Sequence, residues 1–142
     1  MTDIINTPPQ PLPDADTEGF WEATAEGRLT ACHCRHCGNW MMPPLERCRL
    51  CAGPTAFDEI AGTGTLYSFI VQHHRSVPGY FDQLPYVVGL MQIDEQPRVR
   101  IQGRVVGIDP ADVKCGMRVR AEIVPLPGGD YKVPVLRPLV EG

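Results

Sequence analysis

The sequence predicts a mainly β protein made of an N-terminal helix, a small metal-bound ribbon and a five-stranded barrel. Three observations support this prediction. Five of the six cysteines lie between residues 32 and 51, and four of them form two C-x2-C pairs. Beyond residue 57, short segments rich in β-branched and aromatic residues alternate with turn residues. The 142-residue chain also contains 15 Pro and 14 Gly, which favours short elements joined by turns over long helices.

The chain begins with an expected arm and an expected helix. Residues 1–15 contain four prolines and predict an extended, mobile arm. Residues 16–27, DTEGFWEATAEG, predict a helix with acidic residues in its first turn and Gly27 at its end. Phe20 and Trp21 give this helix an apolar side, so we expect it to dock onto the rest of the chain or onto a partner protein.

The cysteine-rich segment, residues 28–56, predicts a zinc ribbon. One pair is formed by Cys34 and Cys37, and the other by Cys48 and Cys51. In each pair a tight turn can bring two thiolates to one ion, and four thiolates match the tetrahedral preference of zinc. Four protein ligands also close the coordination shell, so the expected zinc is structural and not catalytic. Iron in a rubredoxin-like centre is the alternative that the sequence leaves open.

Neighbouring residues have other expected roles. Gly38 and Gly53 can supply the left-handed backbone that the two cysteine turns need. Cys32 lies only two residues before the first ligand, which fits the turn geometry poorly, and we expect a free thiol there. Cys115 has no base beside it in the sequence and is expected to be a small buried apolar residue.

Residues 57–142 predict the barrel. A short helical turn at 107–117 lies between the third and fourth of five expected strands, and this order is typical of the OB-fold. Prolines interrupt the last strand, which favours a position at a sheet edge. The expected strands are residues 63–74, 86–93, 98–106, 118–124 and 130–140.

Charge and composition limit the functional classes. The net charge is −4, and the only basic excess lies around the cysteines, which is a weak footprint for a nucleic-acid-binding protein. The N-terminus has no basic segment followed by an apolar run, and no apolar stretch approaches the ~20 residues that span a bilayer. We therefore expect a cytoplasmic protein with no membrane segment.

Few residues suggest catalysis. The sequence has no G-x-S-x-G, P-loop or dinucleotide-binding glycine motif. His73 and His74, at the end of the first barrel strand, are the best acid–base candidates and could face a substrate. Tyr80 and Phe81 lie in a proline-bounded loop and could contact a partner or pack internally.

The ordered motifs resemble a known family from about residue 14 onward. They are CRHCG (34–38), CRLC (48–51), GTGTLYSF (62–69), PYVVGLMQID (85–94) and GIDPADVKCGMRV (107–119). This order is similar to the zinc-ribbon/OB-fold acyl-CoA-associated proteins, also known as domain of unknown function 35. The resemblance implies the four metal ligands named above and a role as an accessory subunit without catalysis of its own.

The same resemblance implies partners and a substrate class. Members of the family look like accessory subunits of thiolase-superfamily enzymes, namely thiolases, thiolase-like aldolases or acyltransferases, acting on acyl-CoA. Some relatives assemble with MaoC-like hydratases. The chain is thus expected to complete such a complex.

A single-stranded nucleic-acid-binding protein is the alternative, because zinc ribbons and OB-folds both serve that function. Five arginines on the expected strands could form its basic patch: Arg98, Arg100, Arg104, Arg118 and Arg120.

Overall fold

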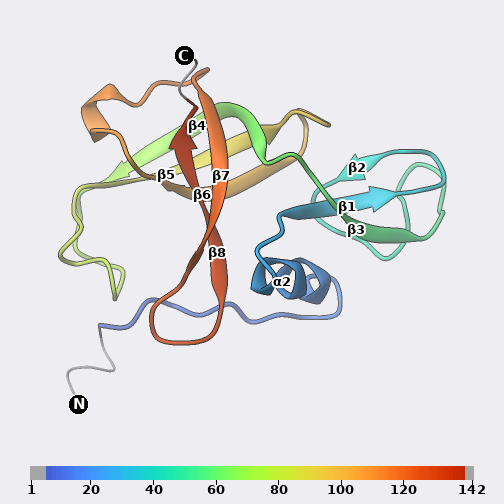
Figure 1. Cartoon of the computed structure of the whole chain (residues 1–142), viewed down its shortest axis with the longest axis horizontal. Helices are drawn as coiled ribbons and strands as arrows, with labels where there is room; N and C mark the ends of the chain where they lie inside the picture. The colour runs from blue at the N-terminus through green and yellow to red at the C-terminus, as the bar shows by residue number, and fades with distance from the viewer. Residues whose placement is uncertain (1–5, 140–142) are drawn as a thin grey trace.

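The computed structural model describes residues 6–139 as a helix, a small sheet and a barrel (Figure 1). The helix is α2 (Glu18–Ala25). Three antiparallel strands follow in the order β2-β1-β3: β1 (Thr30–Cys34), β2 (Trp40–Met41) and β3 (Thr55–Glu59). Five strands then close a barrel in the order β4-β5-β6-β8-β7, with a 3-10 turn η1 (Pro110–Asp112) between β6 and β7. The barrel strands are β4 (Thr63–Gln72), β5 (Tyr86–Ile93), β6 (Arg100–Val105), β7 (Arg118–Pro125) and β8 (Lys132–Pro138).

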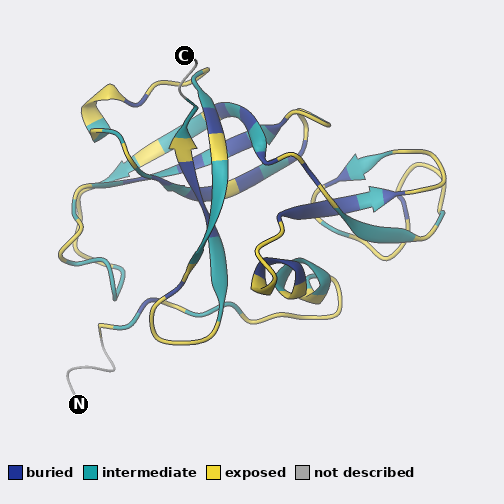
Figure 2. Ribbon diagram, in the orientation of Figure 1, coloured by how far each residue is buried: buried dark blue, intermediate teal, exposed yellow. Residues whose placement is uncertain are grey.

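This architecture confirms the predicted fold class. Along β5, Val87, Gly89, Met91 and Ile93 are buried and the residues between them are half-buried (burial colours in Figure 2). The alternation is what a strand with one buried face requires. At η1 the Asp109 side chain accepts a hydrogen bond from the N–H of Ala111, so the turn begins at the predicted place.

The predicted edge position of the last strand is wrong. β8 pairs with β7 over seven residues and with β6 at two, which closes the barrel. The parallel pairing with β6 uses only Val135 and Leu136, which lie between Pro134 and Pro138. A strand with two prolines can therefore be internal, because its second partner needs only the stretch between them. Residue 140 of the expected strand lies outside the described residues.

The N-terminal arm is extended but lies against the barrel. Pro8 is buried. The Gly79 N–H donates to Asn6 Oδ1, and Gln10 Nε2 donates to the carbonyl oxygen of Pro127, both at 2.9 Å. These contacts join the arm to the β4–β5 and β7–β8 loops (Figure 1). The first five residues of that arm lie outside the described residues.

The helix packs between the small sheet and the barrel. It contacts β1, β3 and β8 and buries Ala23 and Thr24. Gly27 follows it with φ 79°, as expected at a helix end. Within the part of the chain that the structure describes, no helix has both the length and the apolarity needed to cross a membrane.

Arg118 on β7 and Asp94 beyond β5 form an ion pair across the barrel rim. Two guanidinium nitrogens of Arg118 donate to the Asp94 carboxylate at 2.7 Å, and Thr63 Oγ1 donates to it as well. These hydrogen bonds, those of Arg118 first, lower the pKa of Asp94 to about 2. The ionised carboxylate therefore contributes stability above its unfolded pKa of 3.8, and this contribution is lost as pH falls toward 2.

Asp94→Asn is expected to lower the free energy of unfolding by about 1 kcal/mol at pH 7, because both side chains are more than one third exposed and solvent screens the pair. The difference from wild type should shrink between about pH 4 and pH 2. Urea titrations across this range measure it. Asp82→Asn, at an exposed carboxylate with no ion pair among residues 6–139, is the control and should change nothing. A pH-independent difference for Asp94→Asn would contradict this account.

Candidate functional site

Two tight turns with the same backbone hydrogen bonds carry the paired cysteines. The Gly38 N–H donates to the Cys34 carbonyl oxygen, and the Ala52 N–H donates to the Cys48 carbonyl oxygen, both at 2.8 Å. Gly38 and Ala52 thus hold equivalent places, with φ of 81° and 63°. The second turn therefore places an alanine in left-handed backbone, which glycine adopts without steric cost.

The prediction that Gly53 supplies this left-handed backbone is wrong, since Ala52 does so. Gly53 is needed for space. A Cβ atom there would lie 3.1 Å from the Cβ of His36 and 3.2 Å from the Sγ of Cys51. A glycine can be required either by left-handed backbone or by lack of space for a side chain. Spacing in the sequence cannot separate these two reasons, because the lack of space at Gly53 comes partly from His36 in the other cysteine turn.

The four sulfur atoms of Cys34, Cys37, Cys48 and Cys51 converge on one point. All of them lie within 4.8 Å of one another, with 3.5 Å between Cys34 and Cys51 and 3.6 Å between Cys37 and Cys48. A tetrahedral zinc with bonds of about 2.3 Å needs sulfurs about 3.8 Å apart. The cluster therefore fits a four-thiolate zinc, and the protein supplies all four ligands, as in structural sites.

Backbone N–H groups prepare part of this cluster for a cation. The Leu50 N–H donates to the Cys48 sulfur and, as the main cause, lowers the pKa of that thiol to about 6. The Cys37 N–H does the same for Cys34, whose pKa is also lowered. The hydrogen bond from the Asn39 N–H lowers the pKa of Cys37. Burial and the neighbouring Cys48 sulfur outweigh this effect and raise that pKa to about 12. Four thiolates this close repel one another, so a bound cation is what allows all four to ionise.

The two remaining cysteines lie outside the cluster. Cys32 is free and buried, with its Sγ 3.6 Å from the Leu45 carbonyl oxygen. Cys115 is free and exposed, so the expectation of a buried residue is wrong. It lies in the turn between η1 and β7, next to Gly116, whose N–H donates to the Leu66 carbonyl oxygen of β4.

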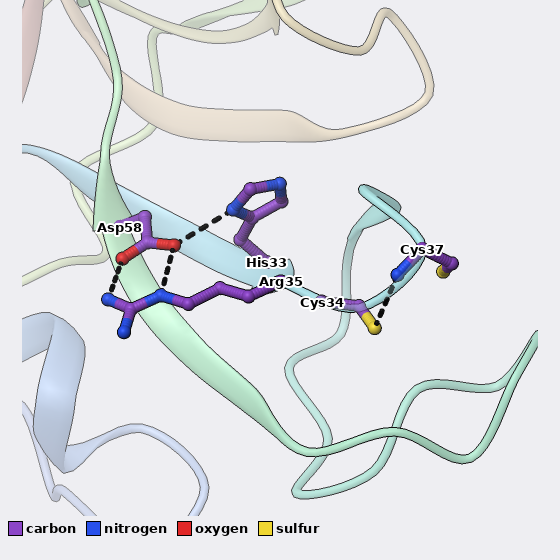
Figure 3. A network of polar contacts seen from close by, with 5 residues as sticks. All are labelled: His33, Cys34, Arg35, Cys37 and Asp58. Atoms are coloured by element: carbon purple, nitrogen blue, oxygen red, sulfur yellow. Dashed lines mark hydrogen bonds and ion pairs between the residues drawn. The ribbon is translucent and has the colours of Figure 1, made fainter.

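A polar network not predicted from the sequence fixes the side of the ribbon beside the metal ligands (Figure 3). His33 Nδ1 lies 2.8 Å from Asp58 Oδ2, and Arg35 Nε donates to the same oxygen at 3.0 Å. Arg35, with a smaller contribution from His33, lowers the pKa of Asp58 to about 2. The His33 ring stacks on Trp40 at 3.9 Å. Asp58 lies on β3, opposite β1, and no sequence pattern joins residues this far apart.

The two aromatic residues of the helix make contacts within the chain. Phe20 packs against the barrel core, and Trp21 meets Tyr131 edge-to-face at 5.9 Å. Both side chains are half-buried. A contact of Phe20 or Trp21 with a partner protein stays a prediction.

The β4–β5 loop holds the other candidates. Tyr80 lies 5.3 Å from the Tyr86 ring, and Phe81 lies under the Arg75 guanidinium. His73 and His74 are exposed just beyond β4 and lie outside the cavity described next. Their predicted roles, partner contact for the aromatics and substrate contact for the histidines, stay predictions.

An apolar cavity of about 690 Å³ lies between the barrel, the ribbon, the helix and the arm. The outer faces of β5, β6 and β8 form one wall, and α2, β1 and β3 contribute to the opposite one. The arm lines it through Pro9, Gln10 and Pro11. This cavity depends on how four separate segments assemble, so no local sequence pattern predicts it. Representative wall residues are Phe20, Met41, Phe57, Tyr80, Val88 and Val133.

Family comparisons match both parts of the chain. The ChsH2 rubredoxin-like zinc ribbon domain matches residues 21–58, and the ChsH2 C-terminal OB-fold domain matches residues 58–124. A probable enoyl-CoA hydratase alpha subunit from Thermomonospora curvata is 34% identical over 136 residues, or 93% of this chain and 40% of that protein. A DUF35 domain-containing scaffold protein from Methanocaldococcus jannaschii is 36% identical over 96 residues, or 66% of this chain and 65% of that protein. The chain thus spans less than two thirds of either relative.

A solved structure matches the whole arrangement. A chain of the Ltp2-ChsH2(DUF35) aldolase superimposes with a TM-score of 0.84 and 32% identity, covering 92% of this chain and 100% of that one. The zinc ribbon, the barrel and their relative placement are therefore shared. The chain belongs to the ChsH2/DUF35 family of zinc-ribbon and OB-fold proteins.

Proposed function

We propose that this chain is a non-catalytic accessory subunit that binds a thiolase-superfamily enzyme acting on acyl-CoA and completes its active complex. The observation that carries the proposal is the match of 92% of this chain to a whole chain of the Ltp2-ChsH2(DUF35) aldolase. The name of that structure joins two proteins, Ltp2 and ChsH2(DUF35), in one aldolase. The carbon–carbon bond chemistry would then belong to the partner subunit.

The geometry of the metal cluster supports an accessory role. Four cysteine sulfurs surround the proposed zinc, which leaves no ligand position for water or substrate. The ion would hold the ribbon in shape. The ribbon would then serve as a rigid surface, since about 25 residues cannot bury enough apolar area to fold without a metal.

Exposed apolar side chains on the ribbon support a role as a contact surface. Met42, Leu45 and Leu50 are 46%, 38% and 72% exposed in the loops around the metal cluster. Apolar residues grouped at the protein surface are typical of binding sites. We propose that this ribbon surface docks the partner enzyme. A MaoC-like hydratase is the second partner class to test, since the T. curvata relative is described as a hydratase alpha subunit.

The geometry of the barrel disfavours the nucleic-acid alternative. OB-folds bind oligonucleotides on strands two and three and on the adjoining loops. In this chain the corresponding strands are β5 and β6, and the corresponding loops are β4–β5 and β7–β8. The arm, the helix and the ribbon lie opposite them across the cavity, where an oligonucleotide would have to bind. Arg118 is engaged with Asp94, and Arg100 lies over the Tyr67 ring at 3.8 Å.

Coexpression with thiolase-superfamily enzymes encoded near its gene tests the proposal. We expect one of them to copurify with the tagged chain in a fixed molar ratio through size-exclusion chromatography. A fluorescent single-stranded oligonucleotide, titrated at two salt concentrations, tests the alternative. If no enzyme copurifies and the chain binds the oligonucleotide in a salt-sensitive way, the proposal is wrong and a nucleic-acid-binding function replaces it.

A further inference from the structure

The cavity between ribbon and barrel has an unusual distribution of charge. Most side chains of its walls are apolar or aromatic, with a few uncharged polar ones such as Thr17 and Gln102, and Arg104 is the only charged residue among those that line it within the described chain. Its volume of about 690 Å³ lies within the range of small-molecule sites, roughly 300–1,000 Å³. Apolar walls of this kind favour a ligand that replaces water over most of its surface.

Arg104, one of the residues that line this cavity, is held in place by the neighbouring loop. One of its guanidinium nitrogens donates to the Gln83 side-chain oxygen, and the guanidinium lies 5.3 Å from the centre of the Tyr80 ring. These contacts come from the β4–β5 loop, whereas Arg104 itself lies on β6. A planar guanidinium fixed in this way has further N–H groups to offer an anion.

We propose that this cavity binds an apolar organic molecule that carries a single negative charge, with the anionic group paired to Arg104 and the apolar body between the barrel and the ribbon. One cation in an otherwise uncharged wall matches one anionic group. It does not match the several phosphates of a nucleotide, whose burial against apolar walls would be costly. The ligand is therefore distinct in chemistry from the CoA portion of an acyl-CoA.

Both sides of the cavity contribute to the proposed selectivity. Phe57 of β3 and Phe20 of the helix belong to the ribbon side, while Tyr80, Tyr86 and Val88 belong to the barrel side. Flat aromatic walls suit a ligand with a ring system. Met41 adds an adaptable side chain that can adjust to the shape of that ring.

Two fluorescent probes that share a naphthylamine body test the proposal on the purified full chain. 1-Anilinonaphthalene-8-sulfonate carries one negative charge, and N-phenyl-1-naphthylamine carries none. We expect one saturable site per chain for the anionic probe. Arg104→Gln should weaken the anionic probe about tenfold and leave the neutral probe unchanged, since a charge-assisted hydrogen bond has about this effect.

A matched pair of variants locates the site. Val88→Trp places a bulky ring in the cavity and should weaken both probes at least tenfold. Ile70→Trp adds the same ring at the cross-strand neighbour of Val88, which is 61% exposed and outside the cavity lining, and should leave both probes unchanged. Circular dichroism and zinc content verify folding, and Val133→Phe on β8 replaces Val88→Trp if that variant does not fold.

Three results would overturn the proposal. They are the absence of a saturable site in the wild-type chain, unchanged binding in folded Val88→Trp and Val133→Phe, and equal weakening of both probes by Arg104→Gln. Because the titration uses the chain alone, its result does not depend on whether a thiolase-like partner binds.

Discussion

Cys34→Ser and Cys48→Ser are each expected to lose most of the bound zinc and to unfold the ribbon. Each substitution removes one of four converging ligands, and the apparent free energy of structural zinc binding is roughly 10–16 kcal/mol in small peptides. This is comparable to the whole stability of a typical domain, about 5–15 kcal/mol. Metal content per chain, measured by elemental mass spectrometry, and limited proteolysis of residues 28–56 check the result.

Cys115→Ser is the matched control, because its thiol is exposed and outside the cluster. It should retain one zinc per chain and the protease resistance of wild type. The same elemental measurement decides between zinc and iron. Full metal occupancy in both ligand variants would refute the assignment of the cluster.

Gly64→Ala is expected to destabilise the barrel by about 3 kcal/mol, a large effect for adding one methyl group. Gly64 lies in β4, where the neighbouring strand β5 approaches closely. A Cβ atom at this position would lie 2.0 Å from the Gln92 carbonyl oxygen and 2.7 Å from Met91 Cγ. The backbone oxygen cannot turn away as a side chain can, so the two strands must separate. Denaturant unfolding measures the change.

Gly129→Ala provides a matched control. Its added Cβ atom would lie 2.4 Å from Gln10 Oε1, which is the end of a flexible side chain on the arm. We therefore expect a loss under about 0.5 kcal/mol. Similar losses for the two variants would mean that contact with the β5 backbone is not what requires glycine at position 64.

The parts of the structure that follow local rules could be predicted from the sequence. The two C-x2-C pairs identify the metal cluster because ligands so close in sequence need only a tight turn to meet. The strands of the barrel follow from alternation, as in β5. The helical turn after β6 follows from Asp109 and Pro110, which start it.

The rest depends on contacts between distant segments. The pairing of β8 with β6 as well as β7 cannot be inferred from a proline-interrupted strand, because barrel closure involves the whole sheet. The Asp58 network joins β1 to β3. The cavity requires the arm, the helix and the ribbon to lie over one barrel face, and only the assembled chain shows this.

The dependence of partner turnover on this chain tests the central claim most directly. The measurement titrates purified chain into a fixed amount of the copurifying thiolase-superfamily enzyme and follows turnover of its acyl-CoA substrate. The account predicts that turnover is low without the chain, rises in proportion to it and saturates at a fixed molar ratio, while the chain alone has no activity. Turnover that is independent of the added chain, or activity of the chain alone, would contradict the account.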